Sequence, residues 1–147
     1  MQSEARREIV LSGENFKVIR QLTFQLPNLS REILSRWGWN SDIKSLLKGL
    51  ARSIPFEISP TARVNIVITN DSISNALAAE NNRSAGAADA PDTEIVRFLP
   101  SAVAHIWVPL LDEASEFLGS VEAQHRTGFY ENEIRAALNA LRSEMHG

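Results

Sequence analysis

The sequence predicts a single α+β domain with a mainly antiparallel sheet and helices packed on one side of it. Three observations predict this class. The chain has 147 residues, about the length of one ordinary domain. Short alternating or β-branched runs occur in it beside apolar stripes of helical period. No internal repeat or change of composition divides residues 1–147, so strands and helices are expected to share one core.

The first predicted strand covers residues 16–26, where apolar and polar side chains nearly alternate. Ser12 and Gly13 before it and Pro27 after it are the expected breakers. A short helix is predicted over 29–37, because its apolar residues fall on one face. Gly38 is expected to end that helix.

The clearest helix is predicted over 41–54. Asn40 or Ser41 can cap it, and Pro55 stops it. Its apolar residues form one continuous stripe at helical spacing, made of Ile43, Leu46, Leu47, Leu50, Ala51 and Ile54. The β-branched run at 63–69 predicts an interior strand, and residues 73–81 are suited to one or two helical turns.

Two more strands are predicted near the C-terminus, at 102–111 and 117–124, with the polar segment 112–116 joining them as a hairpin. Pro109 indicates an edge or a bulge, because proline cannot donate to a β-ladder. A helix over 130–145 closes the domain. Residues 82–93 contain no large apolar side chain, so we expect a flexible loop there.

The composition excludes several classes of protein. The apolar fraction of 44% and the charged fraction of 22% are those of a folded domain, and no run approaches the roughly 18 apolar residues of a membrane-spanning helix. The absence of cysteine excludes disulfides, iron–sulfur sites and thiol catalysis. The polar N-terminus lacks the apolar core of a signal peptide. We therefore expect a cytoplasmic protein with no membrane partner.

The charge is distributed unevenly along the chain. Residues 1–63 hold ten Lys or Arg and six Asp or Glu, a net charge of +4, whereas residues 64–147 hold five and twelve, a net charge of −7. The favoured interpretation is that the two halves of one domain pair with each other. The basic residues are scattered without regular aromatic neighbours, so no nucleic-acid partner is predicted.

No catalytic or metal-binding constellation is present in the sequence. His105, His125 and His146 lack the spacing of metal ligands, and no glycine-rich nucleotide motif or serine nucleophile motif occurs. We therefore predict a protein that is not an enzyme, with no catalytic residue and no metal site, and the sequence identifies no cofactor.

Three motifs follow one another in the last third of the chain: Val108-Pro109-Leu110, then Leu118-Gly119-Ser120-Val121, then the aromatic and acidic residues 129–133 running into Ile134. This pattern resembles the end of a GAF domain, a sensory and signalling module related to PAS. The resemblance implies a GAF-like fold and a regulatory function. The family's cyclic-nucleotide signature and its bilin-binding cysteine are absent, so the resemblance identifies no ligand.

Two function hypotheses follow from the sequence. The first is a non-catalytic regulatory or sensory GAF-like module that binds a small molecule or a protein partner, with His105 and Trp107 as candidate ligand-binding residues. The second is a protein interaction or assembly module without a ligand. A pocket of roughly 300 Å³ or more between the sheet and residues 70–101 would favour the first hypothesis.

Two alternatives stay open at this point. Trp107 can instead be an ordinary core residue, which is the favoured interpretation. The GAF resemblance also implies a homodimer through the helices at 41–54 and 129–145. Each of these helices has a single apolar stripe, however, and packing within one chain already requires one.

Overall fold

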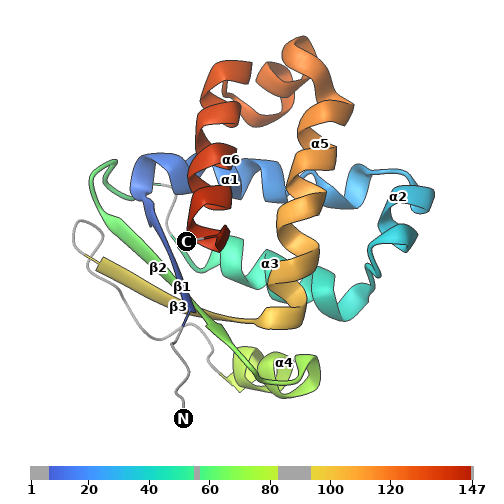
Figure 1. Cartoon of the computed structure of the whole chain (residues 1–147), viewed down its shortest axis with the longest axis vertical. Coiled ribbons are helices and arrows are strands. Elements are labelled where there is room, and N and C mark those ends of the chain that lie inside the picture. Colours follow the sequence, from blue (N-terminus) through green and yellow to red (C-terminus); the bar gives the residue numbers. More distant parts are fainter. Residues whose placement is uncertain (1–6, 55–56, 83–93, 147) are drawn as a thin grey trace.

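The computed structural model describes residues 7–54, 57–82 and 94–146, and within them three strands form one sheet in the order β1-β2-β3 (Figure 1). β1 (Arg7–Ser12) pairs antiparallel with β2 (Arg63–Thr69), and β2 pairs parallel with β3 (Glu94–Pro100). The α+β class is confirmed. The mainly antiparallel, GAF-like sheet is not confirmed, because one of the two pairings is parallel.

Six α-helices and one short 3₁₀ turn complete the part of the chain that the structure describes. They are α1 (Gly13–Thr23), the 3₁₀ turn Leu26–Asn28, α2 (Arg31–Arg36), α3 (Ser41–Arg52), α4 (Ile73–Asn82), α5 (Ser101–Thr127) and α6 (Glu131–His146). The loop predicted at 82–93 lies outside the described residues, except for Asn82, which ends α4.

The two faces of the sheet have different surroundings. One face is covered by α1, α3, α5 and α6, which Figure 1 shows gathered on the same side of the three strands. Side chains from all three strands are buried on this face: Ile9, Leu11, Val64, Ile66, Ile95 and Leu99. On the other face Val10, Val96 and Phe98 are exposed.

Most of the predicted helices, and the predicted interior strand, are confirmed. α3 begins where Asn40 Oδ1 accepts a hydrogen bond of 2.9 Å from the Ile43 N–H, and its apolar stripe is buried. β2 is the central strand of the sheet, as its β-branched run predicted. α2, α4 and α6 also lie where helices were expected. Gly38 follows α2 with a φ of 81°, a conformation that glycine adopts without strain.

The strand predicted at 16–26 is wrong, because this segment forms α1 and the 3₁₀ turn. The expected breaker before it is a helix cap: Ser12 Oγ accepts a hydrogen bond of 3.1 Å from the Asn15 N–H. Phe16, Ile19 and Leu22 recur at three-residue spacing and are buried together. The segment 16–26 as a whole fits both an alternating and a helical template, and the cap at Ser12 favours the helix.

The strands predicted at 102–111 and 117–124 are also wrong, since α5 runs continuously through both and through the supposed hairpin connection. Its buried residues have helical spacing, with the set Val103, Ala104, Trp107, Leu110, Leu111 and Ala114. Asp112 does not turn the chain; its carboxylate pairs with Arg142 on α6. The residues of the GAF resemblance therefore lie on α5 and on the segment leading into α6.

Pro109 lies inside α5 rather than at the edge of a sheet. Proline has no N–H and removes a hydrogen bond from the helix, at a cost of up to about 3 kcal/mol. We expect Pro109→Ala to raise the free energy of unfolding by about 1 kcal/mol, because the restored hydrogen bond outweighs the smaller contact area of alanine. Denaturant unfolding measures the change, and an unchanged or lower stability would contradict this interpretation.

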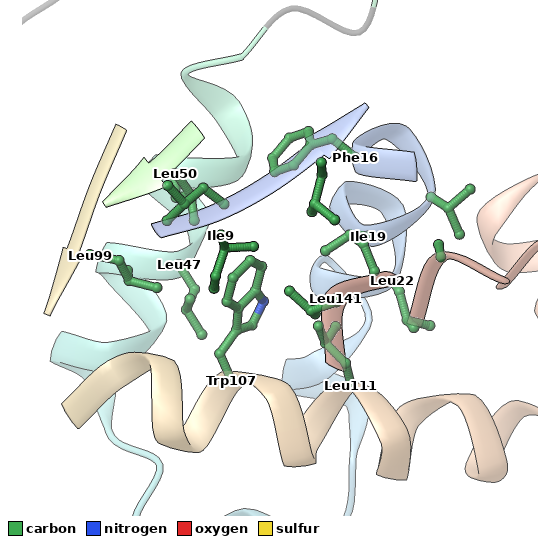
Figure 2. Close-up of a cluster of buried hydrophobic side chains, with 14 of the residues drawn as sticks. Ile9, Phe16, Ile19, Leu22, Leu47, Leu50, Leu99, Trp107, Leu111 and Leu141 are labelled. Carbon is green, nitrogen blue, oxygen red and sulfur yellow. The ribbon is translucent and has the colours of Figure 1, made fainter. Parts of the chain in front are cut away.

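The core lies between the sheet and the helices that cover it. Figure 2 shows the Trp107 side chain extending from α5 into a cluster that includes Ile9, Leu47 and Leu141, which come from β1, α3 and α6. The predicted core position of Trp107 is confirmed, with 1% of the residue exposed. None of the helices searched, which cover the described part of the chain, is long and apolar enough to span a membrane.

Candidate functional site

A cavity of about 250 Å³ lies between the C-terminal end of α1, the turn that follows it and one face of α3. Its lining combines aromatic and aliphatic walls with two lysines, and comprises Thr23, Phe24, Pro27, Trp39, Lys44, Leu47 and Lys48. We call this cavity the Trp39 pocket. Its volume is slightly below the roughly 300–1,000 Å³ of pockets for drug-sized ligands, so it fits a smaller molecule.

Helix α3 provides one wall of the Trp39 pocket. Leu47 is buried, whereas Lys44 and Lys48 are exposed on either side of it. Residues separated by three or four positions share one face of a helix, so these three side chains point in the same general direction. The cap at Asn40 fixes where the helix begins and therefore which residues face the pocket.

The opposite wall is formed by the turn after α1 and by Trp39, which lies in the connection between α2 and α3. Phe24 ends α1, where its N–H donates to the carbonyl oxygen of Arg20 at 3.2 Å, and Pro27 lies in the 3₁₀ turn. Trp39 follows Gly38, and its N–H donates to the carbonyl oxygen of Leu34 at 3.0 Å. The indole is half-buried and packs against the core.

Arg20 packs against the ring of Phe24, which is part of the aromatic wall of the pocket. Its guanidinium lies 5.0 Å from the centre of the Phe24 ring, a cation–π distance, and its Nε donates to the carbonyl oxygen of Ala51 at 3.0 Å. Burial lowers the pKa of Arg20, and the charge of Glu57 opposes that shift. Because the arginine guanidinium stays charged in proteins, Arg20 is a fixed structural cation.

Unlike the Arg20 guanidinium, the ammonium groups of the two lysines have no hydrogen-bond or ion-pair partner among the described residues. Neither the Lys44 nor the Lys48 ammonium forms an ion pair or a hydrogen bond with any residue that the structure describes. No Asp or Glu is among the described residues that line the pocket. One side of the Trp39 pocket therefore has two positive charges that are available to a ligand.

The predicted site residue Trp107 reaches this pocket only indirectly. Its indole N–H donates to Thr23 Oγ1 at 3.0 Å, and Thr23 Oγ1 donates to the carbonyl oxygen of Ile19 at 2.7 Å. Thr23 lines the pocket, whereas Trp107 does not. Trp107 therefore supports the pocket from the core and does not contact a ligand in it.

His105, the other predicted site residue, is exposed on α5. Its Nδ1 lies 2.8 Å from the carbonyl oxygen of Ser101, one turn earlier in the same helix. On a strand, His105 and Trp107 would share a face. On a helix, residues that are two positions apart lie on nearly opposite faces. The structure therefore separates the two residues, and His105 is not part of the Trp39 pocket lining.

Two other cavities contain arginines that already have hydrogen-bond or ion-pair partners. Between α5 and α6, a polar cavity of about 490 Å³ contains the pairs Arg142–Asp112 and Arg135–Glu131. A cavity of about 150 Å³ between α3, α4 and β3 occupies the place where a ligand pocket was expected. It is half the expected size, and Arg97 there donates to the Ser53 hydroxyl and carbonyl oxygens, both at 2.7 Å.

The spacing of Lys44 and Lys48, four residues apart on α3, is visible in the sequence but does not by itself indicate a pocket. Only the turn after α1 and the position of Trp39 place aromatic side chains beside them. No cluster of three or more potential metal ligands was found among the residues that the structure describes.

Comparisons with protein-family models, with curated proteins and with solved structures found no match to this chain.

Proposed function

We propose that this protein is a non-catalytic regulatory or sensory module that binds a small molecule in the Trp39 pocket. One observation carries the proposal: aromatic walls and two unpaired cations line the same cavity. Aromatic and aliphatic walls with a few polar groups are typical of small-molecule sites. This function class is the one that the GAF resemblance implies, but the support comes from residues 23–48 rather than from the C-terminal third.

The proposal does not include catalysis. Among the described residues, the pocket lining contains no carboxylate or histidine that could act as a general acid or base, and Thr23 already uses its hydroxyl in two hydrogen bonds. Such a lining is suited to holding a molecule without transforming it.

The binding proposal is tested with a planar bicyclic probe and its uncharged analogue, 2-naphthoate and 2-naphthamide. A compound of this size gains about 0.3 kcal/mol per non-hydrogen atom, which predicts a dissociation constant of about 1 mM or lower. Ligand-observed NMR titration measures this constant.

We expect Trp39→Ala to weaken the binding of both compounds at least about five-fold, because one aromatic wall is removed. Trp39→Phe keeps a ring and is expected to retain most of the affinity. His105→Ala is the matched control outside the pocket, with no expected change in affinity. The absence of binding by either compound, or full affinity in Trp39→Ala, would refute the proposed site.

The alternative hypothesis, a protein interaction module without a ligand, has an observation of its own. On the outer face of the sheet, Val10, Val96 and Phe98 are exposed at 36%, 42% and 50%. The apolar stripes of α3 and α6 pack into the core of the chain, so we consider the outer face of the sheet, rather than these two helices, as the surface for a homodimer.

The partner considered under this alternative is a second copy of the chain, packed face to face on the outer side of the sheet. Edge-to-edge pairing is opposed at two positions: the Val10 N–H donates to Glu144 Oε1 at 3.0 Å, and the Val96 carbonyl accepts from Arg97 at 2.9 Å. Sedimentation velocity of the wild-type protein and of Phe98→Asp measures whether the chain forms this dimer. A dimer that Phe98→Asp dissociates would support the alternative, and a strict monomer at high micromolar concentration would remove it.

A further inference from the structure

We infer that the ligand of the Trp39 pocket is a small planar aromatic acid, a molecule with an apolar ring and one anionic group. This inference rests on the proposed function and specifies the chemical class of ligand. It combines the charge, the shape and the size of the pocket, each of which restricts the ligand independently.

The charge of the pocket favours an anion. Lys44 and Lys48 lie one helical turn apart, where like charges destabilise each other, and neither has a partner among the described residues. A bound carboxylate would remove that repulsion and contact both ammonium groups. The described lining residues include no Asp or Glu, so none of them competes with the ligand for these two cations.

The use of lysine at this site is unusual for this chain. Twelve of its fifteen cationic residues are Arg and only three are Lys, yet the two cations that line the pocket are both Lys. Lysine is a compact point charge on a flexible stem, and it does not require the planar two-point geometry of a guanidinium. Two lysines can therefore converge on one small anionic group.

The shape and size of the pocket restrict the rest of the ligand. Phe24 and Trp39 supply aromatic surfaces, and Pro27 and Leu47 supply aliphatic ones. Aromatic walls favour a flat ring, which stacks against them or meets them edge to face. At about 250 Å³, the cavity accommodates a molecule of one or two rings rather than a nucleotide-sized ligand.

The test compares 2-naphthoate with 2-naphthamide, which share the ring system and differ in the charge of the head group. We expect the wild-type protein to bind the acid about five- to ten-fold more tightly than the amide. In Lys44→Gln/Lys48→Gln this preference disappears, and the affinity for the amide stays unchanged. High salt is expected to weaken the binding of 2-naphthoate but not of 2-naphthamide, because salt screens the interaction between exposed charges.

Arg52→Gln is the matched control, since it removes one positive charge from the same helix outside the pocket lining. We expect it to retain most of the preference for the acid. Equal binding of acid and amide, or a preference that survives loss of both lysines, would overturn the anion inference and leave the proposed pocket intact. Failure of both compounds to bind the wild-type protein would instead overturn the proposed function.

Discussion

Replacing Trp107 with alanine is expected to lower the free energy of unfolding by about 3–5 kcal/mol, among the largest effects of any single substitution in this chain. The residue is 1% exposed and occupies the centre of the core shown in Figure 2. Its removal leaves a cavity among side chains from β1, α3 and α6. Thr23 Oγ1 also loses the hydrogen bond that it accepts from the indole.

Two further variants separate the contributions of Trp107. Trp107→Phe keeps an aromatic ring but not the N–H donor, so a smaller loss of about 1–2 kcal/mol is expected. Phe98→Ala is the control for an exposed aromatic residue, with an expected change below about 1 kcal/mol. Urea unfolding measures all three. A Trp107→Ala loss below about 1 kcal/mol would show that Trp107 is not the core residue described here.

Replacing Gly13 with alanine is expected to lower the free energy of unfolding by about 3 kcal/mol. A Cβ atom at Gly13 would lie 2.0 Å from the backbone oxygen of Ser59, far inside contact distance. Neither segment can move away easily, because the Gly13 N–H donates to the Ala62 carbonyl at 2.8 Å and the Glu14 N–H donates to the Pro60 carbonyl at 3.1 Å.

Glu14→Ala is the neighbouring control for Gly13→Ala, because it changes an exposed side chain in the same first turn of α1. Its expected cost is below about 1 kcal/mol, the size of a lost interaction with the helix dipole. Thermal and urea unfolding provide the comparison. Equal effects of the two substitutions would mean that α1 does not approach Ser59 as closely as the structure describes.

The segments that were predicted correctly are those in which only one template fits the sequence. The stripe of α3 has a helical period over twelve residues and a cap before it, and the β-branched run of β2 has no helical alternative. In α1 and α5 the apolar residues are dense enough to match both periods. There the choice depends on local caps such as Ser12 and on what the opposite face contacts, and only the tertiary structure sets those contacts.

The candidate site was predicted less well than the fold. Trp107 was correctly expected in the core, but the choice of His105 depended on a strand that does not exist. Lys44 and Lys48 were visible in the sequence as a basic spacing on a helix. Phe24 and Trp39 lie at the two ends of the segment 24–39, which contains the 3₁₀ turn and α2, and no local pattern predicts that both ends lie beside α3.

Protein-observed NMR titration with 2-naphthoate tests the central claim, that the Trp39 pocket is a ligand site, most directly. We expect saturable shifts of the backbone amides around Phe24, Trp39, Lys44 and Lys48 and of the Trp39 indole N–H. We expect little change at His105 and on the outer face of the sheet. Saturable shifts confined to the cavity between α5 and α6 or to Val96 and Phe98, or no saturable shifts at all, would contradict it.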